Sequence, residues 1–133
     1  MLAEVAKQKG ISLCGIQRHQ TTADFSNQNL KPPDTILLAS DLSQAVVTGS
    51  LTSVDLRGNQ LRDEGWGAIF AATCGNKDSK IIAMDASSEN ISPAGVKLIA
   101  EALRTSVTGA LTVTNLLCNV LDVESAMMLA EVA

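Results

Sequence analysis

Apolar and polar residues along the chain follow a pattern that recurs at a fixed spacing. The clearest copy begins at Leu51, and further copies begin at Ile81 and Leu111, the same distance apart in the chain. A weaker copy precedes them at nearly the same spacing and includes Ala23 and Phe25. Such periodicity is typical of proteins that stack similar structural units, so we expect a repeat architecture.

Each copy predicts a short strand followed by a helix. Val54 and Leu56 are apolar while their neighbours in the chain are polar, so one face of the strand is expected to be buried. The period then changes, because Gly65, Ile69 and Thr73 recur at every fourth position and indicate a helix with one inward-facing stripe. Each repeat therefore reads as strand, turn, helix and turn.

Proline and glycine predict where the helices begin and end. Pro93 is expected in the first turn of the third helix, where its missing N–H needs no partner. Gly49, Gly75 and Gly109 follow the helical stretches and are expected to act as C-terminal caps.

The repeats predict one domain that occupies residues 1–133. It contains about four strand–helix repeats and begins with a partial one. The repeats are expected at 21–50, 51–80, 81–110 and 111–133, and the partial repeat at 1–20.

The two ends of the chain share one sequence, because residues 1–6 and 128–133 both read MLAEVA. Both ends are therefore expected to be helical, and neither shows a polar cap. Stacked repeats expose an apolar edge where a cap is missing. We expect the chain to be either a fragment of a longer array or a part buried in an assembly.

Two asparagines stand where the chain leaves a strand. Asn59 and Asn119 occupy equivalent positions, and an amide side chain can satisfy both a donor and an acceptor there. We therefore expect a turn ladder of Asn59 and Asn119. Gln28 and Glu89 stand at the same position in the other copies, so two repeat types alternate along the array.

These residues make the chain resemble the ribonuclease-inhibitor type of leucine-rich repeat. The pattern LxxLxLxxNxLxxxGxxxL of that family is matched almost in full from Leu51 to Ile69, and the resemblance spans roughly residues 21 to 133. Residues 11–26 resemble a divergent repeat of large algal and protist repeat proteins. The resemblance implies an α/β solenoid with a curved parallel sheet on its concave side and helices on its convex side. Glu89 stands where the family pattern has asparagine, so we expect looser packing around it.

Composition excludes several function classes. The chain has 133 residues, 46% of them hydrophobic, which suits one folded domain rather than a disordered chain. Its net charge is −4, whereas nucleic-acid binding requires a basic surface, so we expect no nucleic-acid partner. Direct membrane insertion is not expected because no apolar segment is long enough. An intracellular protein is expected, with the cytoplasm as the default and the organelle left open.

The candidates for chemistry in the sequence are few. Cys14, Cys74 and Cys118 fit neither a metal motif nor a disulfide framework, so they are expected to be buried apolar residues. Cys118 stands at a turn position that Gly58 fills in an earlier copy, so partial exposure is expected there, without the basic neighbour that would make it reactive. His19 is the only histidine and has no catalytic partner at a motif spacing. We therefore expect no catalysis, no cofactor and no metal.

The outward-facing residues of the strands are the candidate site for a protein partner. Asp24, Asp55 and Asp85 align across the repeats, and stacked carboxylates repel one another unless they are solvated or neutralised. A partner with a basic surface is one explanation, and the other is that aspartate is common at this position in the family. The expected partner-binding residues are Asp24, Ser26, Ser53, Asp55, Arg57, Asp85, Ser87, Val113, Asn115 and Leu117.

The sequence thus predicts a non-catalytic protein-interaction or scaffold module that belongs to a larger assembly. The alternative is a regulator of a GTPase, as in the GTPase-activating proteins that this repeat type resembles, with Arg18, Arg57 or Arg62 as the acting residue. Trp66 stands in a column of smaller residues at the start of a helix. It is expected either to pack between helices or to protrude as an anchor for a partner.

Overall fold

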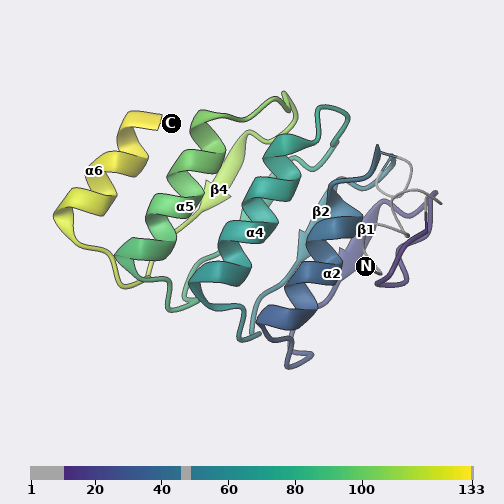
Figure 1. Cartoon of the computed structure of the whole chain (residues 1–133), viewed down its shortest axis with the longest axis horizontal. Helices are drawn as coiled ribbons and strands as arrows, with labels where there is room; N and C mark the ends of the chain where they lie inside the picture. The colour runs from purple at the N-terminus through teal and green to yellow at the C-terminus, as the bar shows by residue number, and fades with distance from the viewer. Residues whose placement is uncertain (1–10, 46–48, 133) are drawn as a thin grey trace.

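The computed structural model of the chain describes residues 11–45 and 49–132, in which strands and helices alternate (Figure 1). The strands are β1 (Thr22–Asp24), β2 (Ser53–Asp55), β3 (Ala83–Asp85) and β4 (Val113–Asn115). The helices are α2 (Pro32–Leu42), α4 (Arg62–Gly75), α5 (Pro93–Arg104) and α6 (Val123–Val132). Each strand and the helix that follows it form one unit, and the units are numbered 1 to 4 along the chain.

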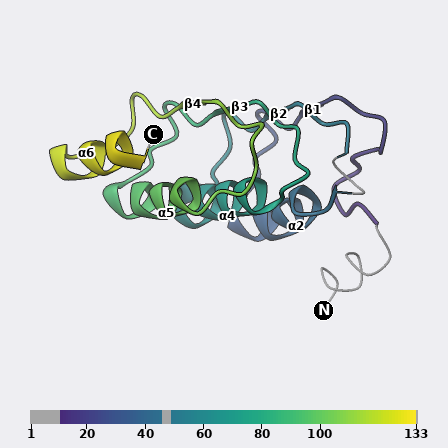
Figure 2. The same ribbon diagram turned by 90° about the horizontal axis from the view of Figure 1, so that it is seen from above.

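The four strands form one parallel sheet in the order β1-β2-β3-β4. Figure 2 shows the strands in one layer and the helices in a second layer against one face of the sheet. Equivalent residues of neighbouring units are in register, as with Asp24 and Asp55, or Asp85 and Asn115. The predicted α/β class is confirmed.

The apolar positions of the repeat fill the space between the sheet and the helices. In unit 2, Val54, Leu56 and Ile69 are all buried, as the strand and helix periods predict. In unit 4 the corresponding Leu116 and Leu129 are only half-buried, because no further unit lies against them within the described residues. The core is therefore complete between the inner units and open beside α6 and β4.

Trp66 belongs to this core. Its side chain is 0% exposed and packs on Phe70, with the ring centroids 6.3 Å apart and the ring planes tilted by 51°. The packing alternative is therefore correct, and Trp66 is no anchor on the surface of this chain.

Helix α5 begins as predicted and is tied to α4. Pro93 is its first residue. The main-chain N of Ser92 donates a hydrogen bond to Asp63 Oδ1 at 2.9 Å, and the Ser92 hydroxyl donates one to Asp63 Oδ2. A carboxylate of one helix thus satisfies polar groups at the start of the next.

The glycine caps predicted at Gly75 and Gly109 are wrong. Gly75 is the last residue of α4, and the C-cap is Asn76 with an extended backbone. The helix before Gly109 ends at Arg104, several residues earlier. Ala45, shortly before Gly49, is again helical, and residues 46–48 lie outside the described residues, so the cap at Gly49 stays a prediction. The C-caps of α2 and α5 are Ser43 and Thr105, whose φ angles are negative, so neither cap requires a glycine.

The first described segment, residues 11–16, is tied to α2 by a buried carboxylate. Asp41 is 0% exposed and accepts hydrogen bonds from Ser12 Oγ at 2.6 Å, Leu13 N at 2.9 Å and Cys14 N at 3.0 Å. The helix predicted for residues 1–6 lies outside the described residues.

Candidate functional site

The strands present one row of side chains to the helices and the other row outward, away from them. The outward row forms the exposed face, which we define as the outward-facing residues of β1 to β4 and of the turns that follow them. Ser53 and Val113 are exposed at the start of their strands, Asp55 and Asn115 are half-buried at the ends, and Asp24 is exposed. The sheet thus brings together the candidate residues predicted from the sequence.

The aspartate column consists of Asp24, Asp55, Asp85 and the aligned Asn115, one residue from each strand end. Each member accepts a hydrogen bond from the main-chain N two residues later, at 2.9 to 3.1 Å. This is the local turn that short Asp and Asn side chains favour. The residue type at this position therefore has a structural cause that is independent of any partner.

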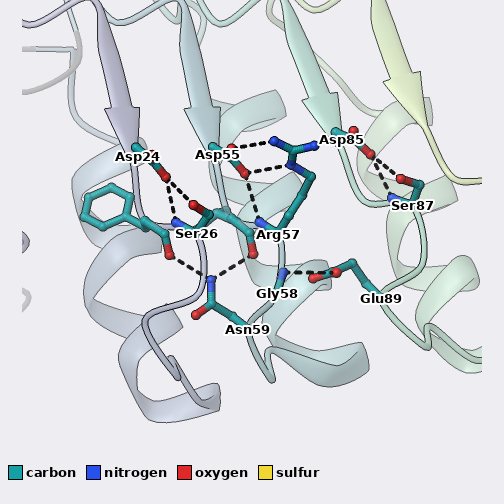
Figure 3. A network of polar contacts seen from close by, with 11 residues as sticks. Asp24, Ser26, Asp55, Arg57, Gly58, Asn59, Asp85, Ser87 and Glu89 are labelled. Atoms are coloured by element: carbon teal, nitrogen blue, oxygen red, sulfur yellow. Dashed lines mark hydrogen bonds and ion pairs between the residues drawn. The ribbon is translucent and has the colours of Figure 1, made fainter.

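Serine hydroxyls complete the turns of units 1 and 3 (Figure 3). Ser26 Oγ donates to Asp24 Oδ1 at 2.6 Å, and Ser87 Oγ donates to Asp85 Oδ1 at 2.6 Å. These side-chain hydrogen bonds, followed by those from the main chain, lower the pKa values of Asp24 and Asp85 below the usual 3.8. Both carboxylates are ionised at neutral pH and held in fixed orientations.

Unit 2 places an arginine where units 1 and 3 have serine. Arg57 donates to Asp55 through Nε at 3.0 Å and through Nη2 at 2.9 Å, a two-point ion pair. The hydrogen bond from Arg57 lowers the pKa of Asp55. Asp85 also attracts the Arg57 guanidinium, so the column contains its own cation between Asp55 and Asp85 (Figure 3).

Unit 4 changes the character of the exposed face from acidic to apolar. Val113 is 57% exposed and Leu117 is 72% exposed, whereas the aligned residues of unit 3 are Ala83 and Ser87. One edge of the face therefore offers apolar side chains, and the rest offers carboxylates.

Asn59 fastens the turns of units 1 and 2 to each other. Its Oδ1 accepts hydrogen bonds from Gln28 N at 3.1 Å and Leu30 N at 2.9 Å. Its Nδ2 donates to Phe25 O and Leu56 O, both at 2.9 Å (Figure 3). One amide thus satisfies two donors and two acceptors of the main chain.

Asn119 fastens units 3 and 4 in the same way. Its Oδ1 accepts from Glu89 N and Ile91 N at 3.0 Å, and its Nδ2 donates to Ala86 O and Leu116 O at 2.9 Å. Both predicted members of the turn ladder therefore join an even-numbered unit to the unit before it.

Glu89 stands at the ladder position of unit 3 and behaves differently. Its Oε2 accepts one long hydrogen bond from Gly58 N at 3.4 Å. Burial raises the pKa of Glu89 above the usual 4.5, and the nearby Asp85 and Asp55 raise it further. A cavity of about 450 Å³ lies beside it, lined by turn residues of units 2 and 3 and by Arg62, Asp63 and Glu64.

The described residues contain no cluster of side chains typical of a metal site. His19 is exposed in a turn, and no group of three metal-binding side chains occurs within residues 11–45 and 49–132. In the same ranges, no helix combines the length and apolar character needed to cross a lipid bilayer.

The three cysteines are buried to different degrees, and Cys118 is the one that was expected to be partly exposed. Cys74 is buried and Cys14 half-buried, but Cys118 is exposed. Cys118 has a φ of 62° in the turn after β4, the left-handed conformation that the equivalent Gly58 adopts after β2. Burial and the neighbouring Asp41 raise the pKa of Cys14 to about 12, and burial raises that of Cys74.

Two polar features of the structure were not predicted from the sequence. The buried Asp41 was missed because its only signal is an acidic residue between the apolar Leu38 and Leu42 in the helical period. The ion pair of Asp55 with Arg57 was also missed, although two opposite charges two residues apart on one strand face could have indicated it.

No protein-family model matches the sequence, and no curated protein matches it either. The function therefore has to be argued from the geometry of the exposed face.

Proposed function

We propose that the chain is a non-catalytic protein-interaction module that binds a protein with a basic surface on the exposed face of the sheet. The observation that carries this proposal is the state of the aspartate column. Asp24 and Asp85 are oriented by hydrogen bonds from serines, and only Asp55 has a cationic partner in direct contact within the described residues. Ionised groups that are already oriented lose little conformational freedom when they bind lysine or arginine.

We further propose that the fold is a leucine-rich-repeat solenoid of the ribonuclease-inhibitor type, with the exposed face as its concave side. Three features support this proposal. The units recur at a nearly constant spacing, all four strands are parallel, and Asn59 and Asn119 join neighbouring turns. Repeat proteins of this general kind present extended surfaces to their partners.

A place in a larger assembly is supported by the apolar side chains of unit 4. Val113 and Leu117 are exposed, and Leu116 and Leu121 are half-buried although the equivalent residues of unit 2 are fully buried. A second protein on this side would remove these side chains from water, which is favourable.

The GTPase-regulator alternative requires an arginine that can reach the nucleotide of another protein. Arg57 is held by Asp55, whereas Arg18 and Arg62 are exposed. No other observation on the described residues favours this alternative. It stays a prediction, and phosphate release from a GTPase, with and without the protein, tests it.

The main test combines native size with chemical cross-linking in an extract of the source organism. We expect elution well above the 13.9 kDa of the single chain. A carbodiimide, which couples carboxylates to amines, should join Asp24 or Asp85 to lysines of a neighbouring protein. Elution near 13.9 kDa without any cross-linked neighbour would refute the proposal.

A matched pair of variants tests the role of the column in the same experiment. D24N/D85N removes two charges from the exposed face, and D78N/E131Q removes two charges from exposed positions elsewhere. We expect the first variant to lose the partner and the second to retain it. Equal retention by both variants would show that the column does not bind the partner.

A further inference from the structure

The junction between units 2 and 3 is open on its sheet side, by which we mean that main-chain hydrogen bonds between the two turns are missing there within the part of the chain that the structure describes. The junctions between units 1 and 2 and between units 3 and 4 have such bonds. At those two junctions, main-chain hydrogen bonds continue the pairing beyond the strand ends. These bonds are Phe25 N to Asp55 O (2.8 Å), Asn27 N to Arg57 O (2.9 Å), Ala86 N to Asn115 O (2.9 Å) and Ser88 N to Leu117 O (3.1 Å). At the junction between units 2 and 3, the equivalent donors are Leu56 N and Gly58 N. The whole turn of unit 3 lies within the described residues, and neither donor forms a hydrogen bond with its main chain. Strands β2 and β3 are paired only at Ser53 and Ala83.

The residue at the ladder position explains this difference. Asn59 and Asn119 close their junctions because an amide both accepts and donates. An ionised carboxylate only accepts, so Glu89 cannot donate to a main-chain carbonyl of unit 2. Its one hydrogen bond across the junction, from Gly58 N, is long at 3.4 Å.

Two buried polar atoms beside the open junction are poorly satisfied. Trp66 Nε1 and Glu89 Oε1 have no hydrogen bond of normal geometry to any described residue, although neither atom contacts solvent. The interaction of the Trp66 indole N–H with the Glu89 carboxylate, although poor in geometry, opposes the rise of the Glu89 pKa. Poorly satisfied buried polar groups destabilise a structure, so a change in the protonation state of Glu89 is able to alter the hydrogen bonding at this junction.

The helix layer of the same junction is closed. Ser92 donates two hydrogen bonds to Asp63, and the side chain of Leu98 lies directly over Gly67. Units 2 and 3 are therefore joined through α4 and α5 and through the pairing of Ser53 with Ala83, whereas main-chain hydrogen bonds beyond the carboxyl ends of the strands are missing at this junction among the described residues.

We propose that Glu89 makes this junction a pH-dependent seam, which is open while its carboxyl group is ionised and closed when that group is protonated. A protonated carboxyl group has an O–H that can donate to a carbonyl, as Asn59 Nδ2 does, and a C=O that still accepts. The charged groups that face Glu89 are Asp55 with its partner Arg57, Asp85, and the cavity residues Arg62, Asp63 and Glu64. This inference concerns the chain alone and does not depend on the proposed partner.

The sign of the effect follows from the raised pKa of Glu89. A carboxyl group whose pKa is higher in the folded chain stabilises the folded state in its protonated form. That stabilisation is complete below the ordinary value of 4.5 and is lost as the pH rises through the higher folded pKa. The seam is therefore closed at acidic pH and open at neutral pH.

Amide hydrogen exchange of the intact protein, measured by NMR and corrected for intrinsic rates, tests the proposal. Protection of Leu56 is expressed relative to Phe25, its equivalent at the closed junction, so that global changes in stability cancel. We expect Leu56 to be clearly less protected at pH 7 and to gain about three- to tenfold at pH 4, as one added hydrogen bond allows.

Two variants assign the effect to the ladder position. Glu89→Gln supplies a donor at every pH, so it should raise the protection of Leu56 at pH 7 and abolish the pH response. Glu64→Gln removes the same charge from the same cavity without reaching the ladder, and should behave as the unaltered protein. The proposal is wrong if Leu56 is already as protected as Phe25 at pH 7, or if the pH response persists in Glu89→Gln.

Discussion

The contribution of the turn ladder to stability can be predicted from Asn59. Replacing Asn59 with alanine removes four hydrogen bonds and leaves two main-chain donors and two main-chain acceptors without that partner. Three of these bonds are partly buried and the one from Gln28 N is exposed. With about 0.5 to 1.5 kcal/mol for each bond, and water replacing the exposed one, we expect a loss of about 2 to 4 kcal/mol.

Urea unfolding measures this loss. The single Trp66 is buried, so its fluorescence reports unfolding directly. The free energy of unfolding should fall while the dependence on urea stays constant, since the surface exposed on unfolding does not change. Asn59→Asp keeps an acceptor but loses the donor, so at neutral pH it should lose at least as much stability as Asn59→Ala.

The control for this prediction is Gln60→Ala. Gln60 is exposed and adjacent to Asn59, and its main-chain N donates to Leu30 O, a bond that alanine retains. We expect Gln60→Ala to stay within about 0.5 kcal/mol of the unaltered protein. If Asn59→Ala fell in the same range, the turns would be held by the main chain and the argument from the amide would be refuted.

Three further predictions follow from the described geometry. Ellman's reagent should modify Cys118 quickly in the folded protein and Cys74 slowly, because burial shields the Cys74 thiol and raises its pKa. A fast phase that persists in Cys118→Ser would contradict this prediction. Gly95→Ala should destabilise the protein by about 1 to 3 kcal/mol in urea unfolding, because the added Cβ would lie 2.5 Å from Asp63 Oδ1. This loss is expected although alanine favours helices, and unchanged or increased stability would show that Asp63 moves freely. The pKa of the Asp85 carboxyl group, measured by NMR titration, should lie below 3.8. The hydrogen bonds to this carboxylate therefore stabilise the folded state above pH 3.8, and that stabilisation is lost as the pH falls through the folded pKa. A measured pKa above 3.8 would exclude these hydrogen bonds in solution.

Much of the architecture was predictable because it depends on a local pattern that recurs. The alternation around Val54 and the fourfold spacing around Ile69 each indicate which side of an element is buried, and both residues are buried. The constant spacing of the copies indicates which residues become neighbours when units stack, as Asp85 and Asn115 do. The helix ends were less predictable because non-glycine caps satisfy the same main-chain groups.

For the candidate site, the sequence predicted only which residues belong to it. Equivalent positions share a strand face, so Asp24, Asp55 and Asp85 had to align. Whether each carboxylate was free or partnered depended on the side chain two residues later and on its conformation. Arg57 occupies the place of a serine and neutralises Asp55. The presence of an aspartate and an arginine two positions apart does not by itself mean that their side chains meet.

The sequence by itself determined the repeat period, the order of strand and helix, the buried stripe of each element and the α/β class, because these follow from patterns within one unit. Only the tertiary structure decided how the units are joined. It gave the predicted ladder residues Asn59 and Asn119 their partners in the preceding units, left Glu89 at an open junction, and buried Asp41 against the first described segment. These contacts join residues that are a whole repeat apart in the chain, and their geometry depends on how closely entire units approach one another, which no local pattern specifies.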